Sequence, residues 1–475
     1  MLLQHMHLKK NYDVIAGPLA FALVAWLLHF YLSLKASLAL GTVIWMGLWW
    51  ITRPVDIAVT AFLPIGINAL FDLVAADQVI TQYFSEIVVL LIGSDLISLT
   101  WSNTGLDKRL AIKTLCCIGT SVRQQIIIWL SVSAVLSIFM PNVVVVMIFV
   151  PIAVSMLKFV GEKNIKGSKV AVPILLAIVW GAGIGGFGSP IGGAANLVAI
   201  SYLENLFGHE FMYVDWVVRF VPCLLLVMLL NLAVLLSIKL PVQQLANTKE
   251  YFQGLYRDLG PMRRGEVLSL GLFATAIVLS FARPLFADLL PSLRPAYIFF
   301  IGGLLTFVLH DEKKQVLLDW RQAEKNLMWG MFFLFAGGLA LGRLVTGTGA
   351  ATELAEVITL LPLTGGLETI FSFVVFATVL TEVSSNTAAA SIAIPIIQGI
   401  GQALELNVVP YLYITIIAVN CAYILPVSIR AIPIGYGLDP AQLLRRGTFL
   451  SLLNILLTTL VGWLFMEYWP LFSTF

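Results

Sequence analysis

A polar break occurs twice in this sequence, each time inside a long apolar stretch. The first break is centred on Asn142 in a Pro-Asn-Val segment, and the second on Asn386 in a Ser-Asn-Thr segment. In both copies a proline, Pro151 or Pro395, follows in the next apolar run. Lipid offers no hydrogen-bond partners, so polar breaks at membrane depth persist mainly where they line a protected cavity. Two such breaks, one in each half of the chain, predict a site between two structural repeats.

The composition indicates that lipid is the solvent for most of this chain. Hydrophobic residues make up 59% and charged residues only 11% of the 475 positions, and the mean hydropathy is +0.95. Soluble domains are far less apolar. The continuous apolar runs predict about 11 membrane-spanning helices. We therefore expect an all-α polytopic protein in the lipid bilayer of a plasma membrane or a bacterial inner membrane. The net charge of +2 gives no indication of nucleic acid as a partner.

A polar connector at 239–265 divides the chain into two halves. We predict N-terminal helices in residues 1–54, a first repeat in 55–238 and a second repeat in 266–475. If each repeat crosses the membrane an odd number of times, the two repeats are inverted relative to each other. The two polar breaks would then approach the middle of the membrane from opposite sides.

Each predicted repeat holds one apolar stretch that is too long for a single span and one that is interrupted. The long stretches at 126–160 and 367–400 carry the polar breaks, which predicts two re-entrant helical hairpins with the breaks at their tips. A glycine-rich segment at 181–193 and an irregular segment at 426–440 interrupt the next apolar stretches. They predict one broken helix in each repeat.

Several segments, including the one around the second break, carry a recognisable pattern. They are 381–388 around that break, 185–192, 334–341, and the short motifs at 319–320 and 323–325. Together these segments resemble the divalent anion/sodium symporter family of the ion transporter superfamily, whose members carry dicarboxylates, citrate or sulfate. The resemblance extends over nearly the whole chain. It implies a homodimer in which a scaffold holds a moving, elevator-type unit that contains both hairpins.

Hairpin tips present helix ends, whose free N–H groups attract anions, together with oxygens that can hold a sodium ion. The resemblance therefore implies that the tips bind both the substrate and sodium as the coupling ion, and no other cofactor is predicted. The predicted substrate contacts are Asn142, Gly193, Asn386, Thr387 and Arg430. The predicted second sodium site consists of Thr381, Ser385 and Asn386.

The first break departs from the family pattern, because Pro141 and Val143 stand where the family usually has hydroxyl residues. The first sodium site would then rest on Asn142, Gly188 and Ser189 together with backbone carbonyls. The sequence leaves open whether this site forms. The number of coupled sodium ions is therefore open as well.

Arg430 is unusual for the family pattern and lies in an apolar region. Arginines within the membrane commonly mark a substrate pathway or an ion pair. A planar guanidinium can bind a carboxylate or sulfate through two parallel hydrogen bonds. Arg430 could equally form a salt bridge with Glu382 or extend to the membrane interface. Asp95, a further charge in an apolar run, is interpreted as a locally satisfied carboxyl rather than as a proton site.

These observations predict a secondary active transporter of a small di- or multivalent anion, first of all a dicarboxylate, coupled to sodium through at least one site. A sodium-independent anion exchanger, a proton-coupled carrier and a sulfate permease of the same fold remain alternatives, because of Arg430 and the missing hydroxyls. The histidines are scattered, so an enzyme is not expected. ATP-driven transport and an ion channel are not expected either, since the sequence has neither a Walker motif nor a filter repeat.

Overall fold

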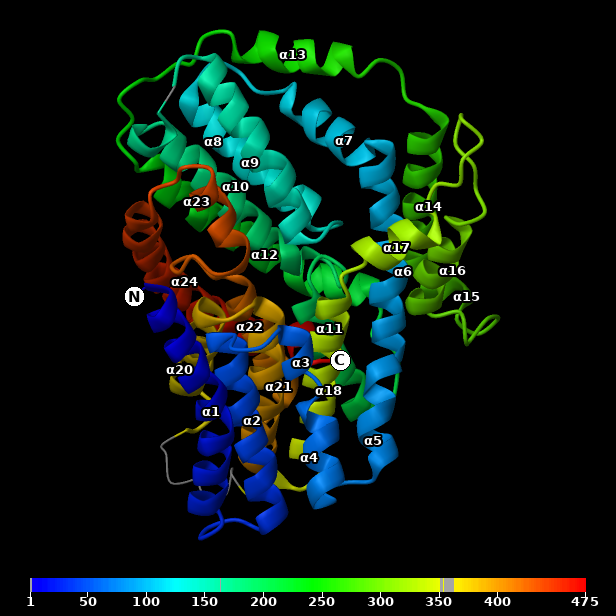
Figure 1. Ribbon diagram of the computed structural model, residues 1–475, viewed down its shortest axis with the longest axis vertical. Coiled ribbons are helices and arrows are strands. Elements are labelled where there is room, and N and C mark those ends of the chain that lie inside the picture. The colour runs from blue at the N-terminus through cyan, green and yellow to red at the C-terminus, as the bar shows by residue number, and fades with distance from the viewer. Residues whose placement is uncertain (1, 163, 351–352, 354–362) are drawn as a thin grey trace.

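The computed structural model describes residues 2–162, 164–350, 353 and 363–475, and the regular elements of these residues are all helices (Figure 1). Eight of the described helices are long and apolar enough to cross a membrane, and further shorter apolar helices accompany them. The prediction of an all-helical protein with many apolar segments is therefore confirmed.

Two long helices at the start of the chain pack side by side, at the lower left of Figure 1. The Ser33 hydroxyl caps the second of them by accepting a hydrogen bond from the Ala36 N–H at 3.3 Å. Three short helices follow. The bounds are α1 (Leu2–Leu28), α2 (Leu34–Thr52), α3 (Ile57–Thr60), α4 (Leu63–Phe71) and α5 (Ala76–Ile80).

Both long apolar stretches form helical hairpins, and the polar breaks lie at their tips. The first hairpin consists of α8 (Val122–Ser137) and α9 (Asn142–Phe159), and the second of α20 (Leu367–Val383) and α21 (Asn386–Ala403). Pro141 has no N–H to continue a helix and disfavours the α conformation in the residue before it, so it separates α8 from α9. At the second tip the Ser385 hydroxyl accepts a hydrogen bond from the Ala388 N–H at 3.2 Å and caps α21.

Each half of the chain also contains a helix that is interrupted. The elements are α10 (Ala171–Gly185), the 3-10 turn η3 (Gly186–Gly188) and α11 (Ala194–Phe207) in the first half, and α22 (Val408–Asn420), η4 (Ser428–Arg430) and α23 (Ala431–Gly435) in the second. The first interruption is shorter than the glycine-rich segment predicted. Gly181, Gly183 and Gly185 continue helix α10, and the chain leaves the α-helix only at residues 186–193.

Close packing explains why these glycines are helical. Helix α8 lies against α10, and a Cβ atom added to Gly181 would be 2.5 Å from the carbonyl oxygen of Leu130. A Cβ on Gly185 would overlap the carbonyl oxygen of Ala134. Small residues allow membrane helices to approach at the backbone. These glycines therefore bring the first hairpin against the broken helix, and they do not interrupt α10.

Replacing Gly185 with alanine is expected to destabilise the protein by about 1–3 kcal/mol, because the added methyl group must push α8 away from α10. The midpoint of thermal unfolding in detergent measures this effect. Gly271→Ala is the matched control, because Gly271 lies in helix α14 (Arg264–Phe281) and a Cβ there meets nothing within 4 Å. Equal midpoints for the two variants would contradict the packing explanation.

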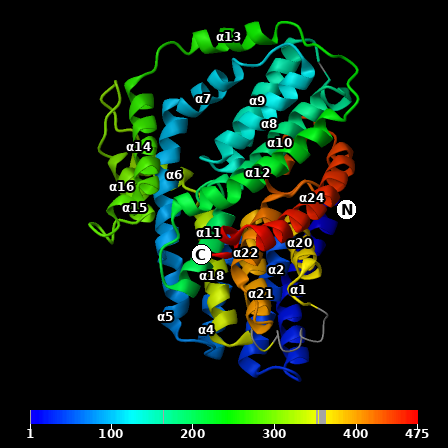
Figure 2. The same ribbon diagram turned by 180° about the vertical axis from the view of Figure 1, so that it is seen from behind.

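The remaining long helices form two groups. One group consists of α6 (Glu86–Thr104), α14 and α16 (Pro295–Leu305), which pack on one another at the right of Figure 1. The hairpins and broken helices pack with α12 (Tyr213–Leu236), α18 (Trp329–Gly347) and α24 (Pro440–Tyr468), and Figure 2 shows this second group from behind. We call these the α6 group and the hairpin group.

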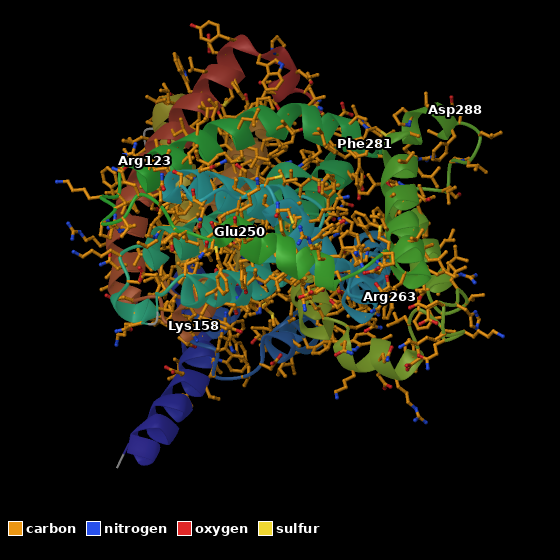
Figure 3. All side chains as sticks on the ribbon, turned by 90° about the horizontal axis from the view of Figure 1, so that it is seen from above. Arg123, Lys158, Glu250, Arg263, Phe281 and Asp288 are labelled. Carbon is orange, nitrogen blue, oxygen red and sulfur yellow. The ribbon has the colours of Figure 1, made fainter. Side chains whose placement is uncertain are left out.

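Two helices lie at the end of the molecule where the groups are connected, at the top of Figures 1 and 2. They are α7 (Leu106–Leu115) and α13 (Thr248–Asp258). The polar connector predicted at 239–265 thus contains a helix. Figure 3 looks onto this end and shows Glu250 on α13 and Arg123 at the start of the first hairpin.

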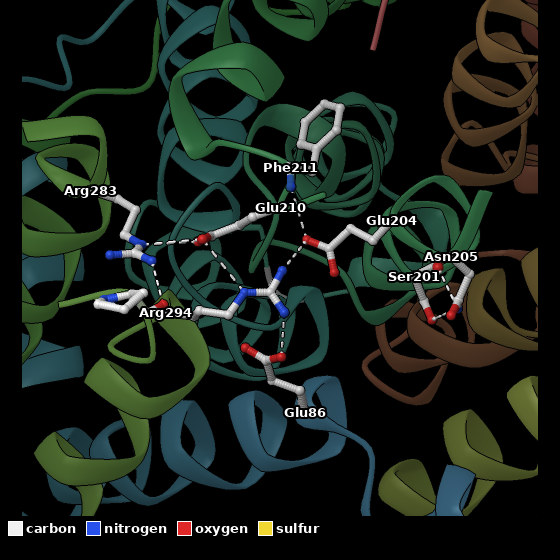
Figure 4. A network of polar contacts seen from close by, with 9 residues as sticks. Glu86, Ser201, Glu204, Asn205, Glu210, Phe211, Arg283 and Arg294 are labelled. Atoms are coloured by element: carbon white, nitrogen blue, oxygen red, sulfur yellow. Dashed lines mark hydrogen bonds and ion pairs between the residues drawn. The ribbon is translucent and has the colours of Figure 1, made fainter. Parts of the chain in front are cut away.

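A network of charged side chains joins the two groups (Figure 4). Arg294, which precedes α16, forms ion pairs with Glu86 at the start of α6 and, at 3.0 Å, with Glu204 near the end of α11. The carboxylate of Glu210 is 3.5 Å from the guanidinium of Arg294 and 3.2 Å from that of Arg283. Since Glu204 and Glu210 belong to the hairpin group, these ion pairs tie that group to the α6 group.

Candidate functional site

The hairpin tips, the helix interruptions and α6 enclose a cavity with a volume of about 300 Å³. The cavity lies between the α6 group and the hairpin group. The hairpin group contributes residues 139–143, 191–195, 385–387 and 428–430 together with Asn420. The α6 group contributes Leu91, Ser94, Asp95, Ser98, Trp101 and Phe273.

Three helices begin at the wall of this cavity, namely α9 at Asn142, α11 at Ala194 and α21 at Asn386. The first N–H groups of a helix have no partners within the helix, and the helix dipole places partial positive charge there. Among the described residues, no side chain caps the start of α9 or α11. A cavity that receives three helix N-termini has free donors and a positive potential, which suit an anion.

Asn386 is held between the second hairpin and the interrupted helix α22. Its Oδ1 accepts a hydrogen bond from the Thr381 hydroxyl at 3.0 Å, and its Nδ2 donates to the Oδ1 of Asn420 at 3.4 Å. The Thr381 hydroxyl also lies within hydrogen-bond distance of the carbonyl oxygen of Val419 and shares its one proton between the two acceptors. Oxygens from Thr381, Asn386 and Val419 therefore lie together. Such oxygens are the ligands that hard cations prefer.

Asn420 extends this network into the first half of the chain. Its Nδ2 donates to the Oδ1 of Asn196 at 3.1 Å, and the Nδ2 of Asn196 donates to the carbonyls of Gly186 and Ser189 at 2.7 and 2.8 Å. The Ser189 hydroxyl in turn donates to the carbonyl of Ile138 at the first tip. Amide side chains thus connect the two tips. The sequence analysis missed Asn420, whose only signal was an amide inside an apolar run.

The predicted substrate contacts all lie in the cavity wall, and they are Asn142, Gly193, Asn386, Thr387 and Arg430. Only some of the predicted sodium ligands lie in the cavity wall. Ser385 lies in the wall, whereas Thr381, Gly188 and Ser189 are buried behind it. The hydroxyls of Ser385 and Ser189 already hold the two tips in place, through the α21 cap and the bond to Ile138.

Arg430 is 2% exposed and forms the ion pair with Glu382 that the sequence left as an alternative. Its Nη2 is 3.7 Å from the Glu382 carboxylate, and its Nε donates to the carbonyl of Leu425 at 2.6 Å. The same carboxylate accepts backbone N–H bonds from Tyr423 at 2.6 Å, Ile424 at 2.9 Å and Leu425 at 3.1 Å. The pair therefore fastens the irregular segment after α22 to the second tip.

The opposite wall carries Asp95 on α6, which is 5% exposed. Its Oδ2 accepts a hydrogen bond from the Met328 N–H at 3.0 Å, as expected for a carboxyl satisfied by its surroundings. Arg53, which follows α2, also lines the cavity. The sequence analysis missed Arg53, although an arginine between two apolar runs and before a proline was a visible signal.

Comparison with known proteins agrees with this architecture. Residues 47–418 match the family described as citrate transporter (CitMHS). The sodium-dependent dicarboxylate transporter SdcS of Staphylococcus saprophyticus is 28% identical, over 95% of this chain and 92% of that protein. SdcS of Staphylococcus aureus is 27% identical, over 94% and 89% of the two chains. Among solved structures, the YdaH transporter of Alcanivorax borkumensis is similar in fold, with a TM-score of 0.53 and 12% identity, over 86% of this chain and 90% of that chain.

Proposed function

Because the chain belongs to the citrate transporter family, we propose that this multi-pass membrane protein is a secondary active transporter of a small di- or multivalent anion, first of all a dicarboxylate. The observation that carries the proposal is the convergence of the N-termini of α9, α11 and α21 on one cavity. An anion loses hydration on entering such a cavity, and free N–H groups and positive helix ends replace the lost interactions. The names of the SdcS relatives support a dicarboxylate.

The two hairpin tips provide the proposed substrate contacts. Asn142 and Asn386 present amide donors at the starts of α9 and α21, and Thr387 adds a hydroxyl. Gly193 has no side chain, so the anion can approach the backbone at the start of α11. Arg430 contributes to the wall from the second half. The two carboxylates of one substrate would thus be bound by residues from both halves of the chain.

Sodium is the proposed coupling ion. The oxygens of Thr381 and Asn386, with Ser385 close by in the chain, support a second sodium site at the tip of the second hairpin. The first site would use Asn142, Gly188 and Ser189. Its support is weaker, because the Ser189 hydroxyl already donates to the Ile138 carbonyl and accepts a bond from the Gly192 N–H at 3.1 Å.

The proposed transport movement is a displacement of the hairpin group, as an elevator-type unit, along the α6 group as a scaffold. The position of the cavity between the two groups supports this division, since a site at that boundary can be exposed to either side. The two halves of the chain, each with a hairpin and an interrupted helix, would be inverted repeats. The working unit would be a homodimer in a plasma membrane or bacterial inner membrane.

Uptake into proteoliposomes tests the proposed function directly. Labelled succinate, malate, citrate and sulfate would be offered with and without sodium outside, with a proton gradient, and with counter-substrate inside. We expect uptake of a dicarboxylate that rises with sodium at low order, because Pro141 and Val143 offer no hydroxyl to the first site. A steep, high-order dependence on sodium would contradict the expected stoichiometry.

The same experiment decides between the proposed function and its alternatives. Uptake that requires only internal counter-substrate would identify a sodium-independent exchanger. Uptake that follows the proton gradient would identify a proton-coupled carrier, and sulfate as the preferred anion would identify a sulfate permease. No uptake of any anion in the panel would overturn the proposed function.

A further inference from the structure

An anion-binding cavity needs uncompensated positive charge in its wall, and in this cavity that charge depends on one residue. Among the described residues, three charged side chains line the cavity, namely Arg53, Asp95 and Arg430. Glu382 compensates the charge of Arg430 at 3.7 Å. Asp95 accepts a backbone hydrogen bond, and within the described part of the chain it has no cationic partner. Without Arg53, the wall would therefore present a net negative charge to the substrate.

Arg53, unlike Arg430 and Asp95, has a charged group without a partner among the described residues. Its guanidinium has no hydrogen-bond or ion-pair partner in that part of the chain. Arg53 is an exposed residue, and it lines the cavity. The carboxylate nearest to it in sequence is Asp56, and this group caps α3 by accepting the Ala58 N–H at 2.8 Å. Arg53 is thus a cation in an anion-binding cavity with its donors unused.

The local backbone holds Arg53 at this position. Arg53 ends α2 in the left-handed conformation, with φ 51°, and its N–H donates to the Trp49 carbonyl at 2.9 Å. Gly47, in the second half of α2, packs against Ile392, about two turns into α21. Helices α2 and α21 are therefore in contact, and Arg53, at the end of α2, lines the same cavity as Asn386 at the start of α21.

We propose that Arg53 binds one carboxylate of the incoming substrate and sets the affinity for multiply charged anions. This inference rests on the proposed function, and it assigns the fixed positive charge of the site to Arg53. A guanidinium offers several donors in one plane and cannot lose its proton at neutral pH. A cation at the mouth of a cavity with low-dielectric walls also raises the local concentration of anions.

The test compares Arg53→Asn and Arg53→Lys with the wild-type protein in proteoliposome uptake of labelled succinate. Asparagine removes the charge and accepts the left-handed conformation better than most residues, which protects the fold. We expect Arg53→Asn to raise KM about tenfold, the loss of one charge-assisted contact. Turnover at saturating succinate should stay near wild type. Arg53→Lys keeps the charge but loses the planar arrangement of donors, so it should raise KM by less than Arg53→Asn does.

Arg123→Gln is the matched control, because Arg123 is an exposed arginine at the start of α8, outside the cavity wall (Figure 3). Its KM should equal that of the wild type. An unchanged KM for Arg53→Asn, in a protein that transports succinate, would overturn the role of Arg53 and leave the proposed function intact. An equal loss in the Asn and Lys variants would also overturn it, since charge would then not matter. A wild-type protein that transports no anion of the panel would overturn both.

Discussion

Asn386→Ala is expected to abolish transport while the protein remains folded. The Asn386 side chain lies in the cavity wall at the start of α21, between the Thr381 hydroxyl and the Asn420 amide. Its loss removes a proposed ligand for the anion and for sodium together. It also removes the link between the second tip and Asn420. Uptake of labelled succinate, at equal amounts of reconstituted protein, measures the effect, and we expect at least a hundredfold loss, about 3 kcal/mol.

Asn326→Ala is the control for this substitution. Asn326 is an exposed asparagine at the end of α17 (Trp320–Asn326), and among the described residues its side chain donates only to the carbonyl of Gln322 at 2.9 Å. Transport by this variant should equal that of the wild type. The elution volume in size-exclusion chromatography should be unchanged for both variants. Normal uptake by Asn386→Ala would move the substrate site away from the second tip.

Glu382→Gln is expected to destabilise the protein by about 3–5 kcal/mol, because it breaks a buried ion pair and leaves Arg430 without its counter-charge. The amide would also direct its NH₂ group at the backbone N–H groups of Tyr423, Ile424 or Leu425, which donate to the carboxylate. The segment after α22 would then lose its connection to the second tip. The midpoint of thermal unfolding in detergent measures the loss.

The control is Glu250→Gln. Glu250 is an exposed glutamate on α13, and its substitution should leave the midpoint unchanged (Figure 3).

Arg430 has two proposed roles, and its own variants separate them. A structural role predicts that Arg430→Gln lowers the unfolding midpoint in the same direction as Glu382→Gln. A role in substrate binding predicts a wild-type midpoint with weaker anion binding, and a loss that is smaller for Arg430→Lys than for Arg430→Gln. A wild-type midpoint for Glu382→Gln would show that the ion pair does not hold the segment.

Local sequence was a reliable guide to the hairpins, because their signals are local. Pro141 and Ser385 each mark the end of one helix and the start of the next, and both effects depend on the residue itself and its immediate neighbours. The glycine-rich segment was interpreted less well. The low helix propensity of glycine predicted a break over the whole segment. Gly181 and Gly185 are helical nevertheless, because their lack of a side chain lets α10 pack directly against the α8 backbone.

Arg430 shows where reasoning from sequence must stop. A charged side chain in an apolar region is unfavourable in free energy, so the sequence predicted that Arg430 contacts either the substrate or an acidic partner. The choice depends on where its guanidinium lies relative to Glu382, on another helix, and in the structure the two groups are 3.7 Å apart. Its role in binding the substrate stays a prediction. Arg53 and Asn420 were missed for the same reason, since each gains its importance only from the cavity that distant segments build.

By itself the sequence determined that this is a helical membrane protein with two polar hairpin tips, because a bilayer penalises every polar break that has no protected environment. The tertiary structure decided the rest of the site. It brought the start of α11 beside the two tips, joined Asn386 to Asn196 through Asn420, and placed Arg53 in the cavity wall without a partner among the described residues. These relations are distances between segments far apart in the chain, and they follow from the packing of helices rather than from any local pattern.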